Sequence, residues 1–273
     1  MIKIVSNSLN SCNKKILEKM NKMDFEFIKK EAVSQLENGA EYIQLNAVSL
    51  LDNEISFYKK VIPIIENLGG KVLIRSNNIE TLSEVIDIAK KEIIIGDIEF
   101  DKKKIDFIVE AIKEKNIKII ALIRENKSDR DIYPEKSLLI AQMYVDYLLD
   151  KGIKRSDILL DPVIKPLEVN FLNGKSFLNT LELFKIDFPQ VKTIANLTAL
   201  SDGLPKRYLI TSHFLSLAIN NGLDYVVLDV LEKSITESIM STMCIIGKDR
   251  NLKSYLNYCR NNRDINGYNI KEN

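Results

Sequence analysis

Short apolar runs alternate along the chain with longer stretches in which apolar residues recur at helical spacing. The runs are residues 2–6, 41–46, 71–76, 93–97, 117–123, 157–161, 192–196 and 225–229. They are rich in Ile and Val and nearly continuous in hydrophobicity, which is typical of parallel strands covered on both faces. The pattern therefore predicts eight parallel β-strands.

The intervening stretches have the pattern of amphipathic helices. They are residues 24–38, 54–67, 78–90, 101–115, 135–150, 174–187, 208–222 and 234–247. In the first of them lysines and glutamates occupy one face, and the opposite face carries Phe25, Ile28, Ala32, Val33 and Leu36. Gly39, Gly152 and Gly222 follow three of these stretches, where the end of a helix favours glycine.

Strand and helix alternate with short connections and without a Pro/Gly/Ser-rich linker, which predicts an α/β protein with a single (β/α)8 TIM barrel over residues 1–250. An open doubly wound sheet is the alternative. That fold normally has a glycine-rich phosphate turn after its first strand, and the segment SNSLNSCNKK contains no glycine. We expect residues 251–273 to add one short helix and a polar tail.

Composition narrows the class of protein. Lys and Arg total 39 against 38 for Asp and Glu, so no basic field attracts a phosphate backbone, and we expect no nucleic acid partner. No signal-peptide pattern and no apolar run of roughly 20 residues occur, which predicts no membrane association. Cys12, Cys244 and Cys259 lack metal-site spacing and are typical of free thiols in the cytoplasm, where we place the protein.

Polar residues collect at the predicted strand ends, which in a barrel of this type meet at the active face. They are Asn7, Asn46, Arg75 with Ser76 and Asn77, Asp97, Arg124, Asp161, Asn196 and Asp229. Carboxylates and carboxamides together satisfy neighbouring N–H donors and ring acceptors. The set therefore suits a flat, polar, heteroaromatic ligand.

Each of these residues also has a purely structural interpretation. Asn7, Asp97 or Asp229 alone is most simply a helix cap or Asx turn. Asp161 is different, because the segment LLDPVIKPLEVN continues from it with Pro162 and without a helical pattern. We interpret Asp161 as a ligand-binding carboxylate.

The basic residues leave two alternatives open. Arg75 and Arg124 either bind an anion or neutralise Asp97 or Asp161 as structural charges. His213, the single histidine, lies within a predicted helix and is interpreted as a packing residue. With one histidine, neither a Ser/His/Asp triad nor a His/Cys metal site is supported, so we predict no bound metal.

Two segments carry a family likeness. Asp161-Pro162 and the stretch ANLTALSDGLPKRYLITSHFLSLAINNGLDYVVLD at 195–229 resemble the pterin-binding methyltransferases, which move a methyl group from 5-methyltetrahydrofolate to a corrinoid protein. In that family the seventh strand ends in a Ser-Asn type pair, followed by a loop, an Asn-Arg motif and a helix of the form FLxxAxxxGLD. The segment GAEYIQLNAVS at 39–49 is similar to the family's second strand.

The resemblance implies roles for four residues. Asp161 would anchor the N–H edge of the pterin, Asn196 would be the catalytic residue near N5, and Asn46 and Arg207 would lie close to the ligand. Arg75 and Asp97, at the ends of the third and fourth predicted strands, complete the substrate-binding set that we expect: Asp161, Asn196, Asn46, Arg207, Arg75 and Asp97. N5 of methyltetrahydrofolate is a poor leaving group until it is protonated, so a hydrogen-bond network around N5 is needed.

The resemblance also implies partners. A Co(I) nucleophile attacks the methyl group, and the chain has no DxHxxG cobalamin motif. The cobalamin would therefore be supplied by a separate corrinoid protein that docks at the barrel mouth, with 5-methyltetrahydrofolate as the substrate. We expect a homodimer.

Three positions depart from the family pattern. Arg75 replaces an Asp of the third strand, Gly96 replaces an Asn of the fourth, and Gln44 replaces an Asp of the second. Asp97 would compensate by pairing with Arg75 or by taking over the missing contact. The alternative is a homologue that has lost or changed its substrate. Dihydropteroate synthase ranks lower, because NAVSLLDN at 46–53 lacks the glycine-rich loop expected after its second strand.

Overall fold

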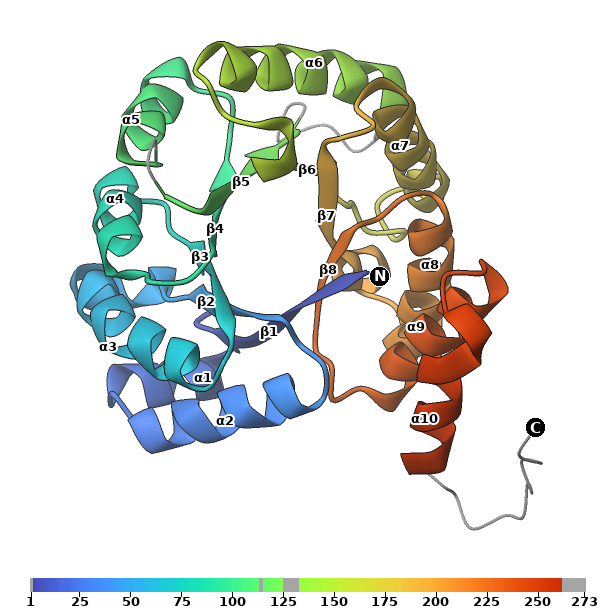
Figure 1. The fold of residues 1–273 in the computed structure, drawn as a ribbon, viewed down its shortest axis with the longest axis horizontal. Coiled ribbons are helices and arrows are strands. Elements are labelled where there is room, and N and C mark those ends of the chain that lie inside the picture. Colours follow the sequence, from blue (N-terminus) through green and yellow to red (C-terminus); the bar gives the residue numbers. More distant parts are fainter. Residues whose placement is uncertain (1, 113–114, 125–132, 262–273) are drawn as a thin grey trace.

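The computed structural model describes residues 2–112, 115–124 and 133–261. Eight parallel strands form a closed barrel in the order β1 to β8, which confirms the predicted (β/α)8 TIM barrel (Figure 1). The strands are β1 (Lys3–Asn10), β2 (Tyr42–Asn46), β3 (Lys71–Arg75), β4 (Ile93–Ile98), β5 (Ile117–Leu122), β6 (Ile158–Asp161), β7 (Lys192–Asn196) and β8 (Tyr225–Leu228).

Helices surround the barrel as an outer ring (Figure 1). They are α1 (Lys14–Asn21), α2 (Phe25–Glu37), α3 (Glu54–Asn67), α4 (Ile79–Ile88), α5 (Lys102–Ile112), α6 (Pro134–Asp150), α7 (Asn173–Asp187), α8 (Arg207–Asn220), α9 (Lys233–Ile245) and α10 (Lys253–Asn261). Short 3-10 helices are η1 (Val48–Asn53), η2 (Arg155–Asp157), η3 (Leu197–Ser201) and η4 (Arg250–Leu252). Gly39, Gly152 and Gly222 have positive φ values after α2, α6 and α8, as predicted for helix ends.

The N-terminal segment differs from the prediction. β1 extends to Asn10 instead of ending near residue 6, with a register shift against β2 between Ser6 and Leu9. Helix α1 was not predicted, because its polar sequence buries only Met20. The side chain of Asn13 accepts from the backbone N–H of Lys15 and begins this helix.

Two separate apolar clusters hold the barrel together. The outer cluster fills the space between strands and helices. The inner cluster fills the barrel with side chains from every strand, namely Val5, Tyr42, Leu73, Ile94, Ile120, Leu159, Ile194, Tyr225 and Val227. Because side chains alternate along a strand, the next inward positions toward the carboxyl ends line the barrel mouth.

Gly96 occupies one of these inward positions, two residues after Ile94. A Cβ atom there would lie 2.7 Å from Cδ1 and 2.8 Å from Cβ of Ile120 on the neighbouring strand. The glycine therefore makes room for Ile120 in the barrel interior. An inward side chain at position 96 does not fit this packing.

We expect Gly96→Ala to lower the free energy of unfolding by about 1 to 3 kcal/mol, because the added methyl group overpacks the barrel. Urea denaturation measures the change. The matched control is Gly174→Ala in α7, where the nearest atoms to the added Cβ are 3.6 Å away. That variant should be as stable as the parent or more stable by up to about 1 kcal/mol. If the Gly96→Ala variant is as stable as the parent, Ile120 does not pack closely against Gly96 in the barrel interior.

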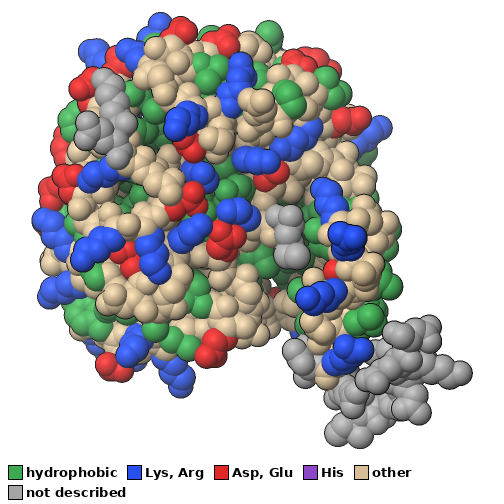
Figure 2. Space-filling view, in the orientation of Figure 1, with side chains coloured by type: hydrophobic (Ala, Val, Ile, Leu, Met, Phe, Trp, Pro, Cys, Tyr) green, Lys and Arg blue, Asp and Glu red, His purple; other side chains and the backbone are tan. Residues whose placement is uncertain are grey.

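Charges are mixed over the visible surface. Basic and acidic side chains are interspersed in the space-filling view, without a large field of one sign (Figure 2). None of the described helices is long and apolar enough to cross a membrane. Within the described ranges, no cluster of three or more His, Cys, Asp or Glu side chains could hold a metal ion. The polar tail expected at the C-terminus falls on residues 262–273, outside the described residues.

Candidate active site at the barrel mouth

Strand register brings the ends of the first four strands to one level of the mouth, with polar side chains on the first three. Asn10 pairs with Asn46, Asn46 with Arg75, and Arg75 with Gly96 across β1, β2, β3 and β4. On the opposite side, Asp161 of β6 pairs with Leu122 of β5. The mouth is therefore lined by carboxamides and charged groups above an apolar barrel interior.

A chain of hydrogen bonds connects these residues, and we call Asn10, Asn7, Gln44, Arg75 and Asp97 the mouth network. Asn7 accepts from the side chains of Asn10 and Gln44 through Oδ1. Arg75 Nε donates to Gln44 Oε1 at 2.7 Å, and Arg75 Nη1 forms an ion pair with Asp97 Oδ2. Asp97 pairs with Arg75, which confirms one of the two arrangements weighed from the sequence.

Asp161 is buried at the end of β6, with a relative exposure of 7%. Its Oδ1 accepts from the backbone N–H of Val163 at 3.0 Å, which closes an Asx turn. Val163 has a φ of 44°, in the left-handed region that a β-branched residue rarely adopts. The loop after Asp161 is thus strained, a feature that is common at ligand sites.

The charges of Asp161 and Arg75 interact. Burial raises the pKa of the Asp161 carboxyl, while Arg75, the backbone N–H of Val163 and Arg124 each oppose that rise. Burial lowers the pKa of the Arg75 guanidinium, and Asp161 opposes that fall. Arg75 therefore pairs with Asp97 and also acts on Asp161, to which Arg124 adds a second positive charge.

Tyr58 of α3 fixes the ends of β2 and β3. Its hydroxyl donates to the carbonyl of Arg75 at 2.6 Å and accepts from the backbone N–H of Ala47 at 3.1 Å. Glu54, one turn earlier, lies 3.2 Å from the same hydroxyl, and burial raises the pKa of its carboxyl. These contacts were not predicted from the sequence, although an i, i+4 Glu-Tyr pair at the start of the second predicted helix was visible.

A second group of polar contacts lies after β7. Asn196 Oδ1 accepts from the hydroxyl of Thr198 at 2.7 Å and from its backbone N–H at 3.3 Å. Arg207, at the start of α8, donates to the carbonyl of Thr198 at 2.8 Å and pairs with Asp202. Arg207 thus holds the η3 loop that begins at Asn196. Among the described residues, no hydrogen bond joins this group to the mouth network.

The remaining candidates are not part of the mouth network. The Asn46 side chain accepts from the backbone N–H of Val48 at 3.4 Å. Asp229 accepts from the backbone N–H of Leu231 at 3.0 Å, the Asx turn expected for it. Arg124 forms an exposed ion pair with Glu99. His213 Nδ1 lies 2.8 Å from the Leu209 carbonyl on the outer helix α8, away from the strand ends.

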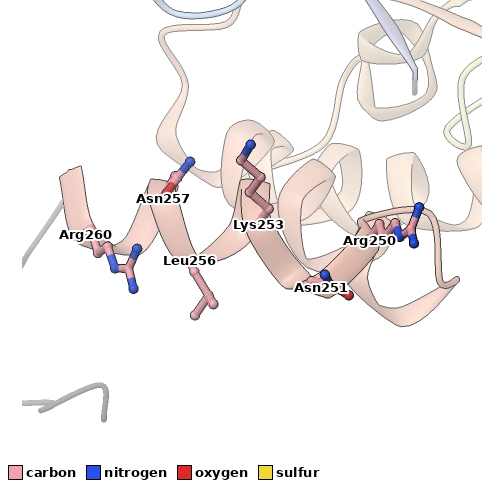
Figure 3. Close-up of a pocket in the computed structure, with 6 residues that line it drawn as sticks. All are labelled: Arg250, Asn251, Lys253, Leu256, Asn257 and Arg260. Atoms are coloured by element: carbon pink, nitrogen blue, oxygen red, sulfur yellow. The ribbon is translucent and has the colours of Figure 1, made fainter. Parts of the chain in front are cut away.

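One pocket adjoins the mouth network. It has a volume of about 320 Å³ and is lined by Ser76, Asn77, Ile79, Leu82, Asp97, Ile98, Glu99, Lys104, Leu122 and Arg124. A groove of about 370 Å³ lies between α8 and α9, on the outside of the barrel. A further pocket of about 390 Å³ is formed only by η4 and α10, so no strand contributes to it (Figure 3). Of these three pockets, the one beside Asp97 lies at the strand ends.

Comparison with known proteins identifies the family. A barrel whose strand ends carry carboxylates and carboxamides is the architecture of a small-molecule enzyme. The family described as pterin binding enzyme matches residues 7–229. The chain belongs to this pterin-binding family, as the resemblance indicated.

One relative has a specific name. The methylcorrinoid:tetrahydrofolate methyltransferase of Eubacterium limosum is 24% identical over 258 residues, which cover 92% of this chain and 94% of the relative.

Solved structures show the same fold. A dihydropteroate synthase of Coxiella burnetii in complex with pteroic acid matches with a TM-score of 0.67 at 14% identity, over 89% of this chain and 92% of that one. The Burkholderia cenocepacia dihydropteroate synthase complexed with 7,8-dihydropteroate gives a TM-score of 0.66 at 14% identity, over 92% of this chain and 94% of that one. These similarities concern the fold alone.

Proposed function

We propose that this protein transfers a methyl group between N5 of tetrahydrofolate and the cobalt of a corrinoid carried by a separate protein. The observation that carries the proposal is the buried Asp161 carboxylate at the mouth of a pterin-family barrel. The backbone engages its Oδ1, so the other oxygen is left for the N–H edge of a pterin. The relative's name, a methylcorrinoid:tetrahydrofolate methyltransferase, supports the pair of substrates.

The other residues have assigned roles in this proposal. Asn196 lies near N5, and Arg207 holds the loop beside it. Asn46, Arg75 and Asp97 complete the polar lining of the mouth. The methyl group moves with one N–C bond breaking and one Co–C bond forming, while the electron pair left on N5 takes up a proton.

The direction of transfer is a separate matter. The sequence resemblance implies transfer from methyltetrahydrofolate to cobalt, whereas the relative's name puts the methyl group on the corrinoid first. Both directions pass through the same transition state. The residues that stabilise it are therefore the same, and the test should follow both.

The proposal is tested by a binding titration and a single-turnover assay. We expect tetrahydrofolate and methyltetrahydrofolate to bind at or below about 1 mM, a modest affinity of about −4 kcal/mol. Mixing the protein under anaerobic conditions with methyltetrahydrofolate and Co(I) cobalamin, or with tetrahydrofolate and methylcobalamin, should transfer the methyl group. Absence of binding at this concentration would refute the proposal.

One observation favours a second candidate function. Arg75, in place of the family's strand-three Asp, is paired with Asp97, so the lining differs from the family pattern. A barrel that binds a folate-like ligand or a corrinoid partner without turnover would bind in the titration but transfer no methyl group in either direction. The homodimer and the cytoplasmic location remain predictions.

Binding should depend on pH through Asp161. An N–H edge requires the ionised carboxylate, and the pKa of Asp161 is raised above its ordinary value. The affinity for tetrahydrofolate is therefore full above that pKa and falls as the pH is lowered through it. The stability of the free protein has the opposite trend, because the folded state binds this proton more tightly than the unfolded state.

Arg75→Met should move this loss of affinity to higher pH. The variant removes the positive charge that lowers the Asp161 pKa. Dissociation constants measured by calorimetry over a pH series for both proteins give the two midpoints, and the ligand's own titration cancels in the comparison. Identical midpoints would show that Arg75 does not act on Asp161.

A further inference from the structure

Two of the three cysteines lie on helices that pack against each other. Cys244 is near the end of α9, and Cys259 is on α10, which lies beside α9 at the edge of the barrel (Figure 1). Both thiols are free and partly buried, whereas Cys12 is exposed. Neither of the two thiols has a part in the proposed function.

Asp249, in the connection between α9 and α10, brings Cys244 to the second helix. Its carboxylate accepts from the backbone N–H groups of Ser254 at 3.0 Å and Tyr255 at 2.9 Å, in the first turn of α10. The Oδ2 atom that binds Tyr255 also accepts from Cys244 Sγ at 3.6 Å. The thiol of Cys244 therefore lies beside the first turn of α10.

Tyr255 extends this cluster to the second thiol. Cys259 lies one turn after Tyr255 on the same face of α10, and its thiol raises the pKa of the Tyr255 hydroxyl through a hydrogen bond. Partial burial, the Asp249 carboxylate and Cys259 each raise the pKa of the Cys244 thiol. The two thiols thus interact across the contact between α9 and α10.

We propose that Cys244 and Cys259 are a redox-active pair that closes to a disulfide in the presence of a small disulfide such as oxidised glutathione. The thiolate of one cysteine attacks the small disulfide, which forms a mixed disulfide and releases one small thiolate. The other cysteine attacks the mixed disulfide, which forms the bond between Cys244 and Cys259 and releases the second small thiolate. Two protons leave the protein thiols, and two electrons reduce the small disulfide to two thiols.

The environment of Cys244 sets the order of the two steps. The thiolate is the reacting form, and the raised pKa of Cys244 keeps this thiol protonated at neutral pH. Cys259 therefore attacks first, and Cys244 resolves the mixed disulfide from α9. The new bond fixes α10 against α9, and a small thiol reverses it.

Oxidised glutathione and mass spectrometry of the digested protein test the proposal. In the folded parent we expect a pair of peptides joined through Cys244 and Cys259, while Cys12 carries at most glutathione. Dithiothreitol should restore both thiols. Resolution of the mixed disulfide should be at least about 10-fold faster in the folded protein than in concentrated urea, because the fold holds the two thiols together.

Single substitutions locate the reaction. Cys259→Ser and Cys244→Ser should each abolish the linked peptides, and Cys244→Ser should retain glutathione on Cys259. Cys12→Ser is the matched control and should form the linked peptides at the parent rate. If the folded protein forms no bond between Cys244 and Cys259, or resolves the mixed disulfide no faster than the protein in urea, the proposal is overturned.

Discussion

Asp161→Asn should weaken tetrahydrofolate binding by roughly 30-fold to several thousand-fold, equivalent to about 2 to 5 kcal/mol. The carboxylate is buried at the mouth and offers an acceptor to the N–H edge of the ring. An amide at the same place presents its own N–H group to a donor edge, which leaves a buried donor unsatisfied. Calorimetry under anaerobic conditions measures the difference.

The stability of the same variant provides an internal control. The amide that replaces the carboxylate retains an oxygen for the backbone N–H of Val163, so the Asx turn survives. Burial of the Asp161 carboxylate, which raises its pKa, disfavours the charged form, and the substitution removes that charge. Arg75 keeps its ion pair with Asp97. We therefore expect the free energy of unfolding at neutral pH to change by no more than about 1 kcal/mol.

Asp146→Asn on the exposed face of α6 is the matched control for the substitution itself. It should leave both binding and stability unchanged. A large loss of stability in Asp161→Asn with little loss of affinity would show that Asp161 is a structural anchor. That outcome would remove the observation on which the pterin site depends.

The barrel could be predicted because its pattern is local. Each strand is a nearly continuous apolar run, and each helix has one apolar face, so the alternation restricts the topology to a closed barrel or an open doubly wound sheet. The absence of a glycine-rich turn after the first strand then favours the barrel. The same rule placed Asp161 and Asn196 at the mouth, because a residue that ends a parallel strand lies at the carboxyl edge. No knowledge of contacts between strands was needed for these residues.

The mouth network was harder to predict because it depends on register. Asn10 became a mouth residue only because β1 continues past the expected end, with a shift between Ser6 and Leu9. Such shifts are set by packing between neighbouring strands, which a single sequence does not display. The pair of Arg75 and Asp97 was one of the alternatives weighed from the sequence, but the bonds that join it through Gln44 and Asn7 to Asn10 were not.

Tyr58 illustrates another limit. In the sequence Tyr58 occupies one more apolar position of an amphipathic helix. In the structure its hydroxyl forms hydrogen bonds with the backbone of Ala47 and Arg75. The partners are backbone groups, and these carry no sequence signal. Residues that position a site through the main chain are therefore found only once the fold is known.

Asn196→Ala should slow single-turnover methyl transfer by about 10²- to 10³-fold, the usual loss when one group that stabilises a transition state is removed. The dissociation constant for tetrahydrofolate should stay within about 3-fold, because the proposed contact with N5 strengthens only as charge develops there. Asn67→Ala, an exposed carboxamide at the far end of α3, is the control and should transfer at the parent rate.

The two directions of transfer make this test sharper. In the structure the Asn196 oxygen is held by Thr198, so the amide is oriented before any ligand arrives. The same transition state is crossed in both directions. Removal of the Asn196 side chain must therefore slow the transfer to cobalt and the transfer to N5 by the same factor when binding is unchanged. Unequal factors would mean that Asn196 acts on one bound state and not on the transition state. Transfer at the parent rate in both directions would show that Asn196 has no catalytic role.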